Sequence, residues 1–330
     1  GYGNFPNISI RGGEGTRSDN VTVMEDGILT APAAYSAPSA YYSPNAARMG
    51  GIEILKGSSQ IAHGPHTTGG VVNFLSTGFP TDHSFYLRST YGSNSAFDVH
   101  SYWSDTSEGD FGKVGILAEI YYRQTDGFRT IDAGNGYAGS DETGFDLMEP
   151  MVKLFWEPNS DVYQRWEFKW GTTEFEADET YAGLTEADIA ANPRRRYAGT
   201  FLDHMSTEHT RTYLKYLVEP ADNLTIQVAG YYNEFERDWY KINKAGGQSV
   251  SKVVADPITY AAAYDDLRLL GTGSLGIKHN SRGYNSKGVQ VNFDYDTEIG
   301  GTAHNITGGA RLHSDSIRRF QQQDTIDLSG

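Results

Sequence analysis

The 330-residue sequence contains no cysteine, which excludes disulfide bridges, thiolate zinc sites and cysteine nucleophiles. It has no run of about 18 apolar residues, so no membrane-spanning helix is predicted. The segment Gly1–Pro6 has neither a basic start nor an apolar run, and we expect no signal peptide there. Basic residues are also scarce: 27 Lys and Arg against 42 Asp and Glu give a formal net charge of −15. This balance argues against nucleic-acid binding, because duplex phosphates require a clustered positive face.

Motifs of common enzyme chemistry are missing as well. The sequence has no G-x-S-x-G, Walker A or H-E-x-x-H pattern. Asp265 and Asp266 are adjacent, but nothing around them suggests a tuned acid–base pair. His63 and His66 lack a nearby third ligand, and the Gly-Pro between them forbids a helix. We therefore predict no catalytic residues, no cofactor and no bound metal.

Glycine and aromatic residues are abundant instead. The chain has 38 Gly and 22 Tyr, with 13% aromatic residues but only 38% hydrophobic residues. Strands whose two faces meet different environments have this mixture, and transmembrane β-barrels are one such class.

From residue 81 onward, hydrophobic residues recur with a period of two, which is typical of β-strands. In the segment 114–123, one face is apolar and the other carries Glu119 and Arg123. Residues 166–170, 214–219 and 289–295 repeat the pattern. We predict about nine strands between residues 81 and 330.

The predicted connections alternate in length. Short turns are expected near residues 106–110, 157–161, 219–223 and 296–301. Long polar segments are expected at 126–145, 177–207 and 241–283. Short turns at one end and long loops at the other are typical of outer-membrane barrels. The periodicity alone also allows a soluble β-sandwich with insertions.

Residues 1–80 have a different character. Short β-type runs at 21–24, 52–55 and 71–75 are separated by glycine-rich turns, and a helical turn is possible around 45–49. We predict a small mixed domain of short strands.

Four motifs occur in this part in a fixed order. They are Ile10-Arg11-Gly12, the Asp26-Gly27 turn within 23–28, Ile52-Glu53-Ile54-Leu55-Lys56-Gly57, and Gly69-Gly70-Val71-Val72-Asn73-Phe74. Together they resemble the plug domain of TonB-dependent outer-membrane receptors.

The resemblance implies a mainly β fold, with a plug domain (residues 1–80) inside a transmembrane antiparallel β-barrel that has 22 strands in the family. Residues 81–330 would supply the N-terminal portion of that barrel with its long extracellular loops. The chain is then expected to be a fragment without signal peptide, TonB box, first part of the plug and more than half of the barrel. The resemblance further implies that the protein lies in the bacterial outer membrane, in contact with lipid and lipopolysaccharide. It also implies TonB with its inner-membrane energising complex as partner, and import rather than catalysis as function.

Two basic residues fall on motif positions with a structural role in the family. The resemblance implies that Arg11 and Lys56 pair with carboxylates of the inner barrel wall and hold the plug in place. Their partners would lie on later strands that this chain lacks. Lysine occupies position 56, where arginine is common in the family. A lysine ammonium would form a single-point ion pair with a carboxylate instead of the bidentate pair that arginine forms.

A long loop suggests the ligand. The segment 182–188, followed by 192–196, is similar to the ferric-citrate-type branch of the family, which implies an Fe(III) chelate as ligand. Thr185 and Asp188 have the spacing of an N-cap pair for a short helix ending before Pro193. That helix would present Arg194, Arg195 and Arg196 together, as a positive site suited to a carboxylate-rich anion. A solvated loop, or contact with lipopolysaccharide phosphates, is the alternative.

Four further residues are candidate ligand contacts. His209 and Arg282 are expected near the outer ends of strands, and Tyr41 and Tyr42 at a plug apex facing the extracellular vestibule. Simple apical packing explains the tyrosines equally well. A receptor for cobalamin, a glycan or heme, and a soluble β-rich binding module or enzyme, remain alternative functions.

Overall fold

The computed structural model describes residues 8–10, 12, 20–30, 42–57, 63 and 69–329. Strands dominate this part of the chain and form a four-stranded sheet and a ten-stranded sheet, with a short two-strand pairing beside them. The predicted mainly β class is confirmed. None of the described helices is long and apolar enough to cross a membrane.

The small sheet is formed by four short strands in the order β2-β1-β4-β3. Their bounds are Val21–Glu25 (β1), Ile28–Leu29 (β2), Met49–Leu55 (β3) and Gly70–Ser76 (β4). β1 and β4 run parallel, whereas the other pairs are antiparallel. A 3-10 turn, η2 (Ala46–Arg48), is capped by the side chain of Asn45. The mixed sheet and the helical turn around residues 45–49 agree with the sequence pattern.

Nine long strands form the large sheet, each antiparallel to its neighbour along the chain. They are Ser84–Tyr91 (β5), Phe97–Gly109 (β6), Gly112–Thr125 (β7), Phe145–Glu157 (β9), Tyr163–Ala177 (β10), His204–Ala221 (β12), Leu224–Ala245 (β13), Ser274–Ile299 (β15) and Thr302–Asp327 (β16). The two-residue strand β14 (Gln248–Ser249) adds to β13. The predicted count of about nine strands is confirmed.

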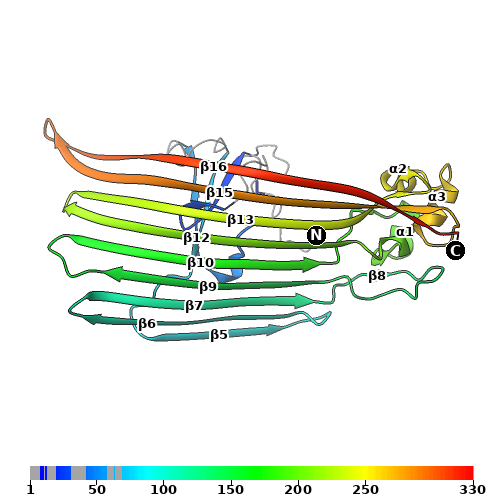
Figure 1. Cartoon of the computed structure of the whole chain (residues 1–330), viewed down its shortest axis with the longest axis horizontal. Coiled ribbons are helices and arrows are strands. Elements are labelled where there is room, and N and C mark those ends of the chain that lie inside the picture. The colour runs from blue at the N-terminus through cyan, green and yellow to red at the C-terminus, as the bar shows by residue number, and fades with distance from the viewer. Residues whose placement is uncertain are drawn as a thin grey trace.

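The connections differ between the two ends of the large sheet. Short turns lie at one end and long segments with the helices lie at the other (Figure 1). The third long loop is shorter than predicted, because β13 continues to Ala245 and β15 begins at Ser274. The pairing of Lys241 with Lys278 and Ile242 with Ile277 extends the backbone hydrogen bonding into a segment that is too polar to read as strand.

The long segments pack into a cluster with its own apolar core. They contain α1 (Glu186–Ala191), α2 (Val250–Ala255), α3 (Ala261–Leu267), η4 (Ala198–Thr200), β8 (Thr130–Ile131) and β11 (Arg195–Arg196). Tyr197, Val253, Leu267 and Leu275 are buried within this core. The helices are short, so their order depends on this packing rather than on helix propensity.

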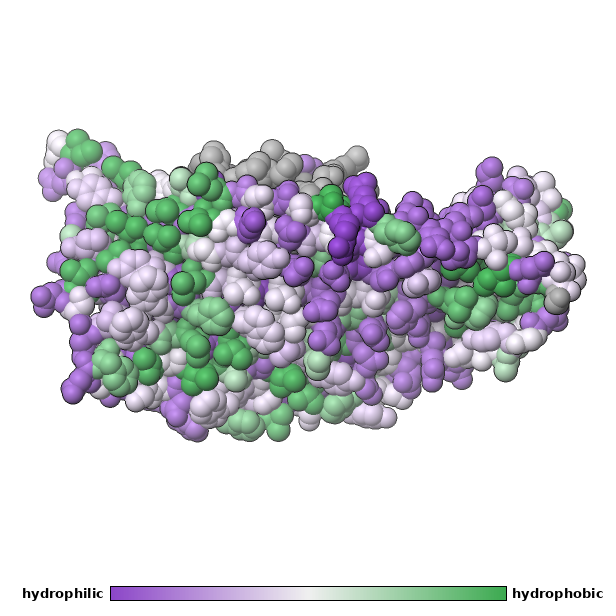
Figure 2. Space-filling view, in the orientation of Figure 1, coloured by the Kyte–Doolittle hydropathy of each residue, from purple (hydrophilic) through white to green (hydrophobic). Residues whose placement is uncertain are grey.

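The two faces of the large sheet have opposite character. On β10, Trp166 and Trp170 are 37% and 38% exposed, whereas Lys169 between them is 2% exposed. Figure 2 shows apolar residues gathered over the short-turn half of the outer face, and polar residues prevailing toward the loops. The opposite, polar face meets the small sheet. The charged faces read from the sequence are therefore the inner ones.

Candidate functional site

A tight turn of the small sheet places a carboxylate against the polar face of the large sheet, which we call the wall. Asp26 and Gly27 join β1 to β2 with φ of 52° and 77°, a left-handed pair that suits an Asp-Gly hairpin turn. Asp26 Oδ2 lies 2.6 Å from Nζ of Lys169 and 3.6 Å from Nζ of Lys153. Nζ of Lys215 donates to the Asp26 carbonyl oxygen at 2.6 Å. Three lysines on β9, β10 and β12 thus hold one turn.

The preceding residue, Glu25, is fully enclosed. Its Oε1 lies 2.5 Å from Nζ of Lys169 and its Oε2 lies 3.5 Å from Nε of Arg211. Arg48 of η2 binds both oxygens, at 3.2 and 3.3 Å, and the Tyr42 hydroxyl donates to Oε2 at 3.0 Å. The carboxylate is therefore surrounded by donors from the large sheet and from the segment 42–48 that precedes β3.

Both carboxyl groups are held ionised. Burial by itself would raise the pKa of Glu25, but Arg48, Lys169 and Arg211 bring it well below its usual range. Burial likewise opposes ionisation of Asp26, and the charges of Lys169, Lys153 and Lys215 bring its pKa well below its usual range. A buried carboxylate retains its charge when paired this closely.

Arg48 joins the same cluster to a carboxylate of the wall. Its guanidinium is 1% exposed and lies 3.3 Å from Oε2 of Glu149 on β9, as well as against Glu25. Removing one partner from such a buried network leaves an uncompensated charge. We call the set Glu25, Asp26, Arg48, Glu149, Lys153, Lys169, Arg211 and Lys215 the plug–wall ionic cluster.

Contacts with the small sheet identify which side chains of later strands point inward. Asn233 of β13 donates to the Leu29 carbonyl and Gln290 of β15 donates to the Gly27 carbonyl. Arg311 of β16 donates to the His63 carbonyl. Since side chains alternate along a strand, odd positions of β13 and β16 and even positions of β15 face inward here.

Three arginines fall on these inward positions in a single row. Arg237 pairs with Arg282 across β13 and β15, and Arg282 pairs with Arg319 across β15 and β16. No register shift separates them from the plug-contacting residues of the same strands. Arg237 is buried and donates to the Asn280 carbonyl, and Arg282 donates to the Tyr284 hydroxyl at 3.4 Å. Like charges placed directly opposite still repel one another, so an anion at this row would be favoured.

The row lies directly beyond an aromatic layer. The neighbouring inward row lies two positions closer to the short turns along each strand. It is formed by His209, Phe235 and Tyr284. The ring of Tyr42 packs on His209 with centroids 4.2 Å apart. The arginine row is therefore on the loop side of the contact between plug and wall.

The predicted ligand contacts occupy different settings. Tyr42 and His209 are 4% and 1% exposed and pack between plug and wall, so the expected vestibule-facing position of Tyr42 is not observed. Arg282 lies in the arginine row. Tyr41 and the predicted lock residue Arg11 lie outside the described residues. Lys56 is exposed immediately after β3.

The predicted helix exists, but it does not present three arginines together. Thr185 caps α1 by accepting a hydrogen bond from the Asp188 amide, as expected. Arg195 pairs with Asp188 at 2.5 Å and with Asp132 at 2.6 Å. Arg196 is 3% exposed and donates to the Asp178 and Thr200 carbonyls, whereas Arg194 is exposed. Adjacent residues on β11 point to opposite sides, which separates the guanidinium groups.

Asp203 ties the same loop to the end of β13. Its Oδ1 accepts from the Ile242 amide at 2.5 Å and its Oδ2 accepts from the Thr180 hydroxyl. Burial raises the pKa of Asp203 to about 7, against the hydrogen bonds from Thr180 and Ile242 that lower it. This loop anchor is thus sensitive to pH near neutrality.

Sequence reasoning missed the plug–wall ionic cluster and two members of the arginine row. A usable signal was present, since Lys153, Lys169, Arg211 and Lys215 all lie on polar strand faces opposite apolar residues. Within the described residues, no group of three or more His, Cys, Asp or Glu side chains is arranged to hold a metal ion.

Residues 1–71 match a family described as the TonB-dependent Receptor Plug Domain. This match covers the part of the chain that contains the Asp26-Gly27 turn and Arg48.

Solved structures similar to the chain are receptors and transporters. The ferric citrate transporter FecA in its unliganded form superposes with a TM-score of 0.70 at 19% identity, over 98% of this chain and 42% of that one. The siderophore receptor PiuA from Acinetobacter baumannii gives 0.62 at 14% identity, over 96% and 42%. The pyoverdine outer membrane receptor FpvA from Pseudomonas aeruginosa PAO1 gives 0.61 at 12%, over 91% and 40%. The chain therefore spans less than half of each of these proteins, and its fold is that of a plug within a barrel wall.

Proposed function

We propose that the chain, whose residues 1–71 match the plug domain of TonB-dependent receptors, is the plug and first barrel strands of a bacterial outer-membrane importer of an Fe(III) chelate. Ferric citrate or a similar siderophore is the proposed cargo. TonB and its inner-membrane energising complex are proposed to supply the energy for transport. Outer-membrane lipid and lipopolysaccharide are proposed to surround the barrel. Residues 1–80 would serve as gate and residues 81–330 as wall and loops.

The arginine row is the observation that carries the choice of ligand. Arg237, Arg282 and Arg319 lie in register on the inward face, in a chain of net charge −15. Guanidinium groups bind carboxylates through charge-assisted hydrogen bonds, and ferric hydroxycarboxylates are anionic. A neutral glycan would gain no ion-pair attraction from three aligned positive charges.

The other candidates fit around this row. Arg194 is exposed in the loop and is proposed as an early contact for the incoming anion. Arg195, Arg196, His209 and Tyr42, which contact protein groups, are proposed as the frame of the site. Tyr41, and a lock role for Arg11 and Lys56, remain proposals based on the family resemblance.

Binding of ferric citrate to the full-length parent receptor tests the proposal. We expect the double change Arg282→Ala and Arg319→Ala to weaken binding at least tenfold, since each lost charge-assisted contact contributes about 1.5–3 kcal/mol. The single change Arg319→Ala is compared with its matched control Arg318→Ala, because Arg318 lies on the opposite face of β16 and pairs with Glu236 at 3.4 Å.

The outcomes separate the alternatives. Equal loss in both variants would indicate a general charge effect and contradict the site. Loss only with Arg194→Ala would place the anion in the loop. Binding of no ferric chelate would contradict the iron proposal.

A further inference from the structure

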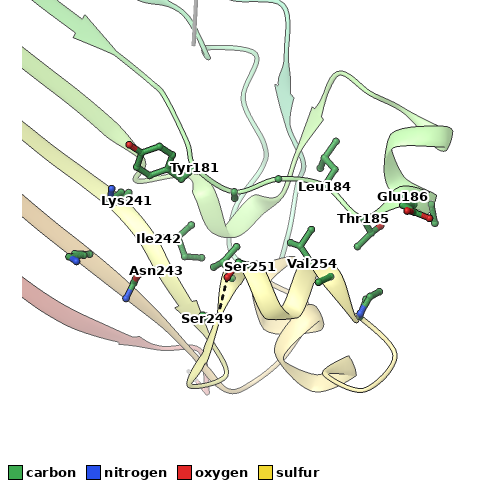
Figure 3. A pocket seen from close by; sticks show the side chains of 17 residues that line it. Tyr181, Leu184, Thr185, Glu186, Lys241, Ile242, Asn243, Ser249, Ser251 and Val254 are labelled. Atoms are coloured by element: carbon green, nitrogen blue, oxygen red, sulfur yellow. Dashed lines mark hydrogen bonds between the residues drawn. The ribbon is translucent and has the colours of Figure 1, made fainter. Parts of the chain in front are cut away.

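A cleft of about 990 Å³ opens among the long loops, beyond the arginine row. Its lining comes from residues 181–187, the end of β13, Lys278 of β15, and residues 249–257 around α2 (Figure 3). Ligand pockets for molecules of drug size have volumes of roughly 300–1,000 Å³. The space is therefore large for a small hydroxycarboxylate alone.

One side of the cleft is apolar. Leu184 from the loop and Val254 from α2 face it (Figure 3). Val250, Ala255 and Pro257 also line the cleft. An apolar wall gains free energy when an apolar group covers it and displaces water.

The other side carries two lysines. Lys241 of β13 pairs directly with Lys278 of β15. The Lys241 ammonium lies 3.9 Å from the ring centroid of Tyr181 and 4.3 Å from that of Trp239, which fixes its position. Two opposed ammonium groups beside an apolar wall are complementary to a molecule with an anionic head and an apolar arm.

The cleft continues into the arginine row. Lys241 lies four residues from Arg237 on β13, and Lys278 lies four residues from Arg282 on β15, in both cases toward the loops. An even spacing keeps the side chains on the same face, and four residues span roughly 13 Å. Arg237, Lys278 and Arg282 all interact electrostatically with Lys241, as does Asp203 with opposite sign. A single ligand of moderate length can therefore contact both places.

We propose that the imported chelate is amphiphilic: its anionic head lies between the lysine pair and the arginine row, and an acyl or aryl arm occupies the apolar side of the cleft. This inference rests on the proposed function and specifies the ligand class that the receptor takes.

Two synthetic probes that differ only in the arm test it. They are ferric complexes of one citrate-based dihydroxamate chelator, bearing either an acetyl or an octanoyl group. Binding is measured on the full-length parent receptor in lipid nanodiscs, so that no detergent competes for the cleft. We expect the octanoyl complex to bind roughly tenfold tighter or more, because six additional methylenes leave water.

The double change Leu184→Ser and Val254→Ser should remove this advantage and leave the binding of the acetyl complex unchanged. Unchanged acetyl binding also shows that the variant is folded. Ile258→Ser is the matched control, because Ile258 adjoins Pro257 but is 89% exposed and outside the cleft lining.

Each result bears on a different statement. Equal binding of the two complexes to the unaltered receptor would overturn the inference and leave the proposed function intact. An advantage that persists in the double variant would place the arm elsewhere and overturn it as well. Binding of ferric citrate but of neither complex would overturn the inference alone, and binding of none of the three would contradict the proposed function.

Discussion

Lys153 and Lys169 occupy directly opposed positions on β9 and β10, and both reach Oδ2 of Asp26 in the plug. Two like charges in this geometry repel each other, and the carboxylates of the plug compensate them. The wall therefore carries a charge pattern that is satisfied when the plug is in place. Plug and wall are complementary in charge at this point, with the carboxylates on the plug.

Changing Lys169 to Met should loosen the plug. The variant removes the closest cationic partner of both Glu25 and Asp26, and breaking a buried ionic contact costs about 3–5 kcal/mol. Hydrogen exchange of the β1 amides in the full-length receptor measures the effect, and we expect faster exchange. Lys287→Met is the control, because Lys287 is exposed on β15. Unaltered exchange in the Lys169 variant would contradict the role of the cluster.

Replacing Gly27 by Ala should strain the turn that presents Asp26. Gly27 has φ of +77°, and no atom lies within 4 Å of the point that a Cβ would occupy, so the cost is purely conformational, at about 1–2 kcal/mol in the free energy of unfolding. Gly230→Ala is the matched control, since it also has open space but no positive φ. Thermal unfolding of both variants gives the comparison, and equal midpoints would show that the turn tolerates a side chain.

The anchor formed by Asp203 should weaken as pH rises. Burial raises its pKa to about 7, above the value of about 3.9 in an unfolded chain. The folded state therefore binds the proton more tightly, and stability falls between about pH 4 and 7 and then levels off. Protection of the Ile242 amide, taken relative to the intrinsic exchange rate at each pH, measures this at pH 5 and pH 8. We expect Asp203→Asn to remove the pH dependence and the exposed Asp222→Asn to retain it; identical profiles for the two would contradict the assignment.

The N-cap of α1 should stabilise the loop that carries the arginines. The Thr185 hydroxyl accepts from the Asp188 amide and donates to the Asp188 carboxylate at 2.7 Å. Thr185→Ala should cost about 1 kcal/mol of loop stability, and Thr185→Ser, which keeps the hydroxyl, much less. Limited proteolysis between residues 178 and 203 detects the difference. Equal cleavage of the two variants would show that packing alone holds the helix.

The same helix gives a second pH effect with the opposite sign. Burial opposes ionisation of Asp188, but hydrogen bonds from Tyr197, Tyr264 and Thr185 and the charge of Arg195 bring its pKa to about 2. A carboxyl group with a lowered pKa contributes stability above the unfolded value and loses it as pH falls toward 2. Proteolysis of the loop should therefore increase below about pH 4, and Asp188→Asn should make it independent of pH in that range.

The local features of the fold follow from the amino-acid sequence alone. Alternation along the chain specified about nine strands and which side chains share a face, since a strand exposes neighbouring side chains to opposite sides. Asp26-Gly27 specified the turn, and Thr185 with Asp188 specified the start of α1. Each of these depends on residues only a few positions apart, whose geometry a short segment already dictates.

Only the folded structure shows which charged side chains contact one another. Glu25 and Lys169 are 144 residues apart, and Arg237, Arg282 and Arg319 come together only through the register of three strands. Arg195 and Arg196, adjacent in the chain, are separated because β11 turns them to opposite sides. Long-range pairing and burial determine which side chains are neighbours, and no local pattern contains that information.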